Sequence, residues 1–169
     1  MLLGAVLLSA CQELPGPYAP PEQRQPFDHF TPYKISRMVD FSQGDANQYI
    51  VRDIWGGDGP WRWTRKQPEV RLFMRTNQML RYAIDFTIVE ATFKDTGPVE
   101  VSFQVNGHEL DRMKCDSQGS RHFEKPVPPE WIEPGKDALV GAEIDKVWYS
   151  PADRQALGFI LTRIGLLQK

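Results

Sequence analysis

The chain has 169 residues, of which 41% are hydrophobic and 25% charged, a composition and length typical of one globular domain rather than two. The formal net charge of −2 and the pI of about 5.9 exclude the global basic field that nucleic-acid-binding proteins use, so we expect no nucleic-acid partner. Two cysteines, Cys11 and Cys115, are too few for a disulfide framework.

The sequence opens on an apolar run, Leu2 to Leu8, followed by Ser9, Ala10 and Cys11. A short apolar core before small residues is the layout of a cleavable export signal, and this run is much shorter than the roughly 20 apolar residues of a membrane-spanning helix. Leu8-Ser9-Ala10-Cys11 resembles the lipobox of bacterial lipoproteins. The resemblance implies that residues 1–10 form a signal peptide. It also implies that the thiol of Cys11 receives a diacylglyceryl group and that its freed amine is acylated.

Lipidation of Cys11 predicts both a location and a membrane partner. Two or three acyl chains anchor a protein stably, since each buried CH₂ contributes about 0.8 kcal/mol. We therefore expect a cell-envelope lipoprotein, on the outer membrane or on the extracytoplasmic face of the cell membrane. Lipoprotein signals usually begin with Lys or Arg, whereas here only Met1 precedes the run. Either the true start lies upstream of Met1, or the amine of Met1 supplies the only positive charge. The alternative to the signal-peptide interpretation is a buried apolar N-terminal segment.

Residues 11–34 form a Pro-rich segment that begins at this cysteine. Proline fixes φ and has no N–H, so we expect neither a helix nor a central strand here. The composition predicts an extended tether of about 3 Å per residue, with a docking ligand for an aromatic groove as the alternative. Its prolines are Pro15, Pro17, Pro20, Pro21, Pro26 and Pro32.

Residues 35–169 are predicted to form one all-β domain. Apolar and polar residues alternate over 80–88 and again over 99–105, which is typical of strands with one buried face. Asn106-Gly107 predicts a type I′ hairpin that returns along His108–Met113. No helix of useful length is indicated, although Arg154–Leu157 is expected to form one turn. Many short strands between Gly- and Pro-rich turns predict an antiparallel β-sandwich. The further strands are expected at Tyr49–Trp55, Trp61–Thr64, Glu69–Met74, His122–Val127, Ala138–Ile144 and Gly158–Leu166.

Five short motifs carry a resemblance to a known fold. In order and spacing they resemble a jelly roll similar to the galactose-binding-like domains and carbohydrate-binding modules of bacterial envelope proteins, over Phe41 to Leu167. The resemblance implies a jelly-roll sandwich more than a function, because jelly rolls host many functions. The motifs are Trp61-Arg62-Trp63-Thr64, Glu69-Val70-Arg71-Leu72, Val105-Asn106-Gly107, Ile144-Asp145 and Asp153-Arg154-Gln155-Ala156-Leu157-Gly158-Phe159-Ile160-Leu161.

The most distinctive local feature is a cluster of tryptophans around a Gly-rich loop, between Asp53 and Arg65. Aromatic faces stack on the C–H surfaces of sugars, and neighbouring polar side chains bind the hydroxyls. Strand alternation puts Trp61 and Trp63 on one face with Arg62 opposite. The alternative is that these aromatics fill the core, which we expect of Trp63 in particular. Aromatics in loops are further candidates. The predicted ligand-binding residues are Trp55, Asp58, Trp61, Arg62, Trp148 and Tyr149.

Other site chemistries have little support in the sequence. The histidines His29, His108 and His122 are far apart, so no metal site is expected, and no cofactor motif or nucleophile elbow occurs. Loop acids Asp145 and Asp153 leave calcium binding as an alternative to plain solvated carboxylates. Cys115 is either a buried thiol or a reactive one. Three carboxylates are candidates to face one cleft, namely Glu100, Asp111 and Glu143.

Three functions follow from these observations, and each predicts a different surface. A non-enzymatic lipoprotein that binds glycan, or serves as an accessory envelope component, predicts an exposed aromatic platform. An enzyme of envelope polysaccharide metabolism predicts two buried carboxylates close together in a cleft. A structural scaffold that binds another envelope protein predicts a flat apolar patch of more than about 300 Å². We expect the first of these, with no catalytic residue.

Overall fold

The computed structural model describes residues 37–168. Cys11, the expected signal peptide and the Pro-rich segment 11–34 lie outside the described residues. Within 37–168, no helix combines the length and the apolar character that crossing a membrane requires.

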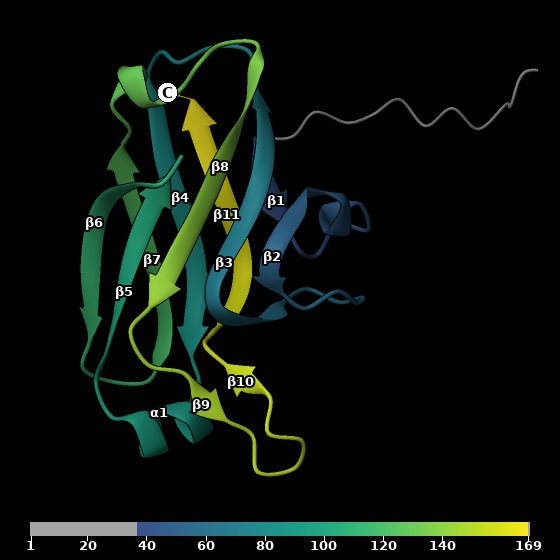
Figure 1. The fold of residues 1–169 in the computed structure, drawn as a ribbon, viewed down its shortest axis with the longest axis vertical. Helices are drawn as coiled ribbons and strands as arrows, with labels where there is room; N and C mark the ends of the chain where they lie inside the picture. Colours follow the sequence, from purple (N-terminus) through teal and green to yellow (C-terminus); the bar gives the residue numbers. More distant parts are fainter. Residues whose placement is uncertain (1–36, 169) are drawn as a thin grey trace, which may run out of the picture. The chain divides into compact units, whose positions relative to one another are not determined.

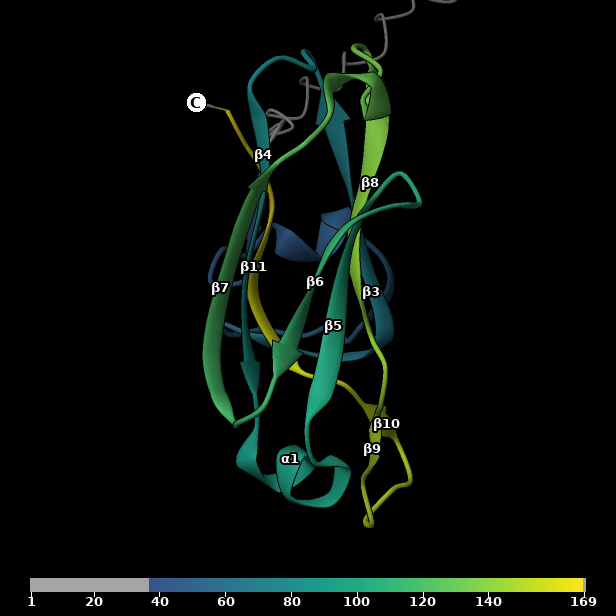
Figure 2. The ribbon, with the colours of Figure 1, turned by 90° about the vertical axis from the view of Figure 1, so that its left-hand side faces the viewer.

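The described residues form an antiparallel sandwich of two layers, seen face-on in Figure 1 and edge-on in Figure 2. One layer has the strand order β6-β5-β8-β3-β2 and the other has the order β7-β4-β11-β1. The first residues of β3 pair with β11, which joins the two layers. The strands of the first layer are β2 (Ile50–Ile54), β3 (Arg62–Met74), β5 (Val99–Val105), β6 (His108–Cys115) and β8 (Lys136–Ile144). Those of the second are β1 (Met38–Asp40), β4 (Leu80–Ile88), β7 (Gly119–Pro126) and β11 (Ile160–Gln168).

Short elements close the ends of the sandwich. A hairpin of β9 (Trp148–Tyr149) and β10 (Ala156–Leu157) lies at the same end as α1 (Glu90–Thr96), as both ribbon views show. Two single 3-10 turns, η1 (Ala46–Tyr49) and η2 (Pro129–Trp131), complete the described elements.

The core follows from the period-two pattern of the strands. In β5 every second residue is buried. In β4 the same alternation holds at every position except Ala83, which is buried between two buried neighbours. Aromatic rings from both layers meet between the sheets: the Phe103 ring on β5 lies 5.6 Å from Tyr82 and 6.2 Å from Phe86, both on β4, between ring centroids. The Tyr82 hydroxyl donates to the carbonyl of Gly141 at 3.0 Å, so this buried polar group keeps a partner.

The predicted all-β antiparallel sandwich is confirmed, and so is the predicted hairpin. Asn106 and Gly107 have φ of 49° and 78°, the two positive angles that a type I′ turn needs. At most connections the chain crosses from one layer to the other, which is the wrapping expected of a jelly roll.

Three details differ from the sequence-based expectations. The two strands predicted at Trp61–Thr64 and Glu69–Met74 are one strand, β3, because Pro68 sits in a bulge rather than ending the pairing. The one-turn prediction for Arg154–Leu157 is wrong, since Ala156 and Leu157 pair with β9, which also removes Trp148 and Tyr149 from the loop where they were expected. Helix α1 was not expected, because seven residues are too few to show a helical period.

Candidate functional site

The candidate site begins at an irregularity between β2 and β3. Ile54 pairs with Thr64 and Arg52 pairs with Glu69, so Asp53 alone stands opposite the four residues 65–68. The backbone of Asp53 has a φ of 54°, in the left-handed region that few residues other than glycine adopt. Its Oδ2 accepts a hydrogen bond of 2.8 Å from the backbone N–H of Gln67, which fixes the carboxylate against the bulge. Bulges of this kind commonly redirect side chains at functional sites.

The start of β3 directs tryptophans outward. Arg62 and Thr64 are buried, so the residues that alternate with them, Trp61, Trp63 and Arg65, lie on the outer face. The backbone N–H of Trp55 donates to the carbonyl of Trp63 at 3.0 Å, which places Trp55 beside it on the neighbouring strand. Trp55 is 36% exposed and Trp61 is 47% exposed, while Trp63 is half-buried. The predicted alternation is correct, but the expectation that Trp63 fills the core is wrong, because Arg62 points inward instead.

A pocket of about 320 Å³ lies at this point and is called the Trp55 pocket here. The guanidinium of Arg65 lies 5.7 Å from the centroid of the Trp55 ring, within the range of a cation–π contact. The same guanidinium donates to Oε1 of Gln155 at 3.2 Å. One aromatic face and several hydrogen-bonding groups therefore converge on one open space. The lining residues are Asp53, Ile54, Trp55, Gly56, Arg65 and Gln155.

Thr64 attaches the Gln155 segment to β3. Its buried hydroxyl donates to the carbonyl of Phe159 at 2.9 Å and accepts from the N–H of Phe159 at 3.0 Å. The N–H of Gly158 donates to the carbonyl of Thr64 at 2.8 Å. A Cβ at Gly158 would lie 2.4 Å from the carbonyl oxygen of Arg65, so only glycine allows this approach. Residues ninety positions apart are thus held together at the pocket.

Arg62 was predicted to bind ligand, but it lies beneath the Gly-rich loop instead. Its side chain is buried, and Nη1 donates to the carbonyls of Gly59 and Trp61 at 2.8 and 2.9 Å. Its Nη2 donates to the carbonyl of Gly57 and, at 3.4 Å, to Oδ1 of Asn47. Arg62 therefore holds the Gly-rich loop from the inside, and only 5% of its surface is left for a ligand.

The other predicted ligand-binding residues are spread over two regions. Asp58 is exposed on the Gly-rich loop and does not line the Trp55 pocket. The indole N–H of Trp148 donates to Oδ2 of Asp95 at 2.6 Å, which ties β9 to the segment of α1, and Tyr149 is 65% exposed on β9. Of the predicted set, Trp55 alone lines the pocket.

Three lining residues, Asp53, Arg65 and Gln155, were not singled out from the sequence. A signal existed for Arg65, because the alternation that aligns Trp61 with Trp63 continues to Arg65 two positions later. No local pattern marks Asp53 or Gln155 as members of the same site, since a bulge and a long-range contact bring them together.

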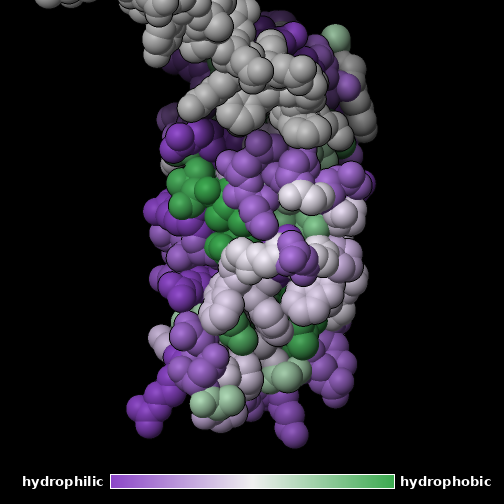
Figure 3. Space-filling model, turned by 90° about the vertical axis from the view of Figure 1, so that its right-hand side faces the viewer, coloured by the Kyte–Doolittle hydropathy of each residue, from purple (hydrophilic) through white to green (hydrophobic). Residues whose placement is uncertain are grey.

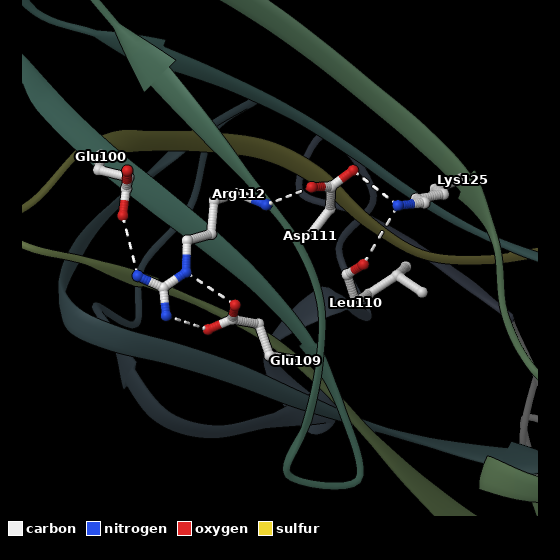
Figure 4. Close-up of polar contacts among 6 residues, drawn as sticks. All are labelled: Glu100, Glu109, Leu110, Asp111, Arg112 and Lys125. Carbon is white, nitrogen blue, oxygen red and sulfur yellow. Dashed lines mark hydrogen bonds and ion pairs between the residues drawn. The ribbon is translucent and has the colours of Figure 1, made fainter.

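A second pocket, of about 190 Å³, lies on the outer face of β5, β6 and β8 and is called the carboxylate pocket here (Figure 4 shows part of it). Two of the three carboxylates expected in one cleft, Glu100 and Glu143, do line it, but Asp111 turns away and pairs with Lys125 at 2.8 Å. The lining residues are Glu100, Ser102, Gln104, Glu109, Arg112, Glu143 and Asp145.

Arg112 neutralises much of the carboxylate pocket. Its guanidinium donates to both carboxylate oxygens of Glu109, at 2.7 and 2.8 Å, and to Glu100 at 3.1 Å. The hydrogen bonds from Arg112 lower the pKa of Glu109. A glycosidase acid needs the opposite shift, a raised pKa that keeps it protonated. This arrangement is therefore poorly suited to acid catalysis.

The remaining titratable groups form no metal centre within 37–168, where no group of three His, Cys, Asp or Glu residues has a ligating arrangement. His108 stacks on Trp131, and Nδ1 of His122 lies 2.6 Å from Oδ1 of Asp85. Cys115 is buried, and burial raises the pKa of its thiol, which indicates an unreactive sulfur.

Comparisons with known proteins give little beyond this geometry. No protein-family model matches the chain, and no curated protein matches it. Among solved structures, a family GH115 4-O-methyl-alpha-glucuronidase with specificity for decorated arabinogalactans is similar over 72% of this chain, at 12% identity and a TM-score of 0.37. This chain spans 16% of the length of that enzyme. A carbohydrate-binding module with specific mannan recognition is similar over 79% of this chain and 97% of its own, at 15% identity and a TM-score of 0.39. Both likenesses fall below the level from which a shared function follows.

Proposed function

We propose that the described domain is a non-enzymatic glycan-binding module whose ligand stacks on Trp55. The observation that carries this proposal is an exposed indole beside an open pocket with polar groups on its other sides. The apolar face of a sugar ring packs on an indole, while its hydroxyls need both donors and acceptors nearby. Arg65 and the Gln155 amide supply donors, and the Asp53 carboxylate supplies an acceptor. A stacking face, donors and an acceptor among the lining residues support the proposal.

Binding fits this pocket better than hydrolysis. A glycosidase uses two carboxyl groups about 5–9 Å apart, and Asp53 is the one carboxylate among the six residues that line the Trp55 pocket. That carboxylate already accepts a hydrogen bond from the N–H of Gln67. The carboxylate pocket has more acids, but Arg112 binds two of them.

A protein-binding scaffold is less well supported. Such a function predicts one continuous apolar patch. On the part of the surface that is coloured in Figure 3, green apolar areas are separated by pale and purple ones. The large exposed apolar residues are Val51 on β2, Trp55 and Trp61 on the loop between β2 and β3, Phe73 near the far end of β3, Met79 before β4 and Tyr149 on β9.

A substitution at Trp55 tests the glycan proposal. The full chain is screened against an array of envelope polysaccharide fragments, and the best ligand is titrated by calorimetry. Trp55→Ala should weaken binding about thirtyfold or more, since truncating an anchoring tryptophan typically costs at least about 2 kcal/mol. Phe73→Ala is the matched control, because Phe73 is 37% exposed on β3 and lies outside the pocket. Absence of any glycan ligand, or equal binding by wild type and Trp55→Ala, would falsify the proposal.

We also propose, from the sequence pattern, that Cys11 carries the lipid that anchors this module in the cell envelope. Anchoring would confine the module near envelope glycans and so raise its effective concentration there. Metabolic labelling with an alkyne fatty acid, followed by membrane fractionation, tests the idea. Cys11→Ala should lose the label and leave the membrane fraction, while Cys115 remains in that variant as an internal control. Retention of label and membrane association in Cys11→Ala would exclude lipidation at this residue.

A further inference from the structure

Arg65 is the cation of the Trp55 pocket. Within residues 37–168, no Asp or Glu oxygen forms an ion pair with its guanidinium; the hydrogen bond that it makes is the one to Oε1 of Gln155 at 3.2 Å. Arg112 in the carboxylate pocket shows the contrast, because two glutamates bind it. A guanidinium has five N–H donors, so Arg65 retains several for a ligand.

The Arg65 guanidinium is also held in place before any ligand arrives. Trp55 lies under it at 5.7 Å, and Gln155 holds Nη2. Nη1 and Nε make no hydrogen bond within the described residues. A fork of donors that is already oriented loses little conformational freedom on binding, and its planar geometry matches a carboxylate in a bidentate contact.

Asp53 does not cancel this charge by direct contact. Its Oδ2 points to the backbone N–H of Gln67 at 2.8 Å, so the carboxylate faces the bulge of β3 and pairs with the main chain. The pocket therefore has among its lining residues a guanidinium with unused donors, a carboxylate acceptor and the Trp55 ring. A sugar with both a carboxylate and hydroxyls meets all three requirements.

We propose that the ligand of the Trp55 pocket is an acidic glycan, in which a uronate carboxylate binds Arg65 while its sugar ring stacks on Trp55. This inference rests on the proposed glycan-binding function. A neutral sugar would leave the free guanidinium donors with hydroxyl partners only, whereas a carboxylate adds the opposite charge and accepts two parallel N–H···O bonds from the planar fork.

The test compares matched pairs of ligands on the full chain. Oligogalacturonate, oligoguluronate and hyaluronan fragments are titrated beside the same fragments after reduction of their carboxyl groups to alcohols. At least one acidic fragment should bind about tenfold or more tightly than its reduced form. The preference should decline as NaCl is raised, because screening weakens the ion pair.

Four substitutions then assign the preference to this pocket. Arg65→Gln should abolish the difference between acidic and reduced fragments, and Arg65→Lys should keep part of it, since lysine keeps the charge but not the planar fork. Asp53→Asn should weaken binding of acidic and reduced fragments by similar factors, because the amide oxygen still accepts from the Gln67 N–H while the NH2 group replaces the acceptor offered to the sugar hydroxyls. Arg71→Gln is the control: Arg71 lies on β3, pairs with Asp137 at 4.0 Å and is outside the pocket.

The outcomes separate the two proposals. If reduced fragments bind as tightly as acidic ones, and Trp55→Ala but not Arg65→Gln abolishes binding, the module binds glycans but the acidic class is wrong. If neither form of any fragment binds and the glycan array is also negative, the glycan-binding function itself fails. If Arg71→Gln reduces the preference for acidic over reduced fragments as much as Arg65→Gln does, the effect does not come from this pocket and the inference is wrong.

Discussion

The Trp55 pocket and the carboxylate pocket lie on the same sandwich and contain similar kinds of charged residue, but they use them differently. In the carboxylate pocket, Arg112 binds Glu109 and Glu100, so opposite charges satisfy one another. In the Trp55 pocket, Arg65 has no carboxylate partner within the described residues, and the Asp53 carboxylate accepts from the main chain. In this part of the chain Arg65 and Asp53 lack a charged partner and lie near an exposed aromatic ring, so they are available to a ligand. The charged groups of the carboxylate pocket already bind one another, so that surface is mainly hydrated.

The two pockets also differ in what supports them. The carboxylate pocket sits on regular strands β5, β6 and β8. The Trp55 pocket depends on a bulge, a Gly-rich loop and a long-range contact. The half-buried Asp53 holds the bulge, and the buried side chains of Arg62 and Thr64 hold the loop and the contact. Substitutions can test that difference, in the supports of the Trp55 pocket and in the carboxylate pocket.

The largest expected effect is that of removing Arg62. Arg62→Ala should lower the free energy of unfolding by about 2–4 kcal/mol, because the carbonyls of Gly57, Gly59 and Trp61 lose a buried donor. The free energy of unfolding of Arg62→Lys should lie between those of wild type and Arg62→Ala, since one ammonium cannot reach all three carbonyls as the guanidinium does. Urea unfolding followed by circular dichroism measures these differences.

Arg71→Ala is the control for Arg62, because its side chain is exposed and its ion pair at 4.0 Å is on the surface. The free energy of unfolding of Arg71→Ala should stay within about 0.5 kcal/mol of the wild-type value. Equal effects at Arg62 and Arg71 would show that the Gly-rich loop does not depend on the buried guanidinium.

The next effect is expected at Thr64. Thr64→Val keeps the shape of the side chain but removes the hydroxyl that bonds both the N–H and the carbonyl of Phe159, so we expect a loss of about 1–2 kcal/mol. The amide proton of Phe159 should exchange faster with solvent, because its acceptor is gone. Thr87→Val is the matched control, since the Thr87 hydroxyl contacts that of Ser120 on an exposed face. Unchanged exchange at Phe159 would mean that Thr64 does not hold the Gln155 segment.

The sequence predicted the regular parts of this molecule well, and physical reasons explain the rest. Strands such as β4 and β5 have one buried face, so their alternation is visible in the sequence, and the Asn106-Gly107 turn has its own local signal. Helix α1 is too short to show a period. The general rule that tryptophan is buried and arginine is exposed failed at Trp63 and Arg62, because the carbonyls of a Gly-rich loop form a partner for the guanidinium that no local pattern reveals.

The candidate site was predicted in part for the same reason. Trp55 was found because clustered tryptophans beside glycines are visible along the chain. Asp53 and Gln155 were missed, since the first joins the pocket through a bulge in β3 and the second through contacts with Thr64 ninety residues away. A site assembled from a bulge and a long-range contact has no signature in either segment alone.

The smallest expected effect concerns the carboxylate pocket and its pH dependence. The hydrogen bonds from Arg112 hold the pKa of Glu109 below its ordinary value, so Arg112→Gln should raise the pKa of Glu109 toward that ordinary value. The pKa of Glu109 is lower in the folded state than in the unfolded state. The Glu109–Arg112 pair therefore contributes its stability above the ordinary glutamate pKa, and this contribution is lost as the pH falls through the lowered pKa of Glu109. The stability difference between wild type and Arg112→Gln should therefore shrink below about pH 4. Carbon-detected NMR titration of the glutamate side chains measures the pKa.

The same variant decides whether the two pockets are functionally distinct. If the carboxylate pocket is a solvated surface whose charges satisfy one another, Arg112→Gln should leave glycan binding at Trp55 unchanged while the pKa of Glu109 moves. If binding weakens as much as in Trp55→Ala, Arg112 and its glutamates belong to the ligand-binding surface. In that case, paired charges in the carboxylate pocket would not prevent it from binding ligand. The assignment of the ligand to the Trp55 pocket alone would then be wrong.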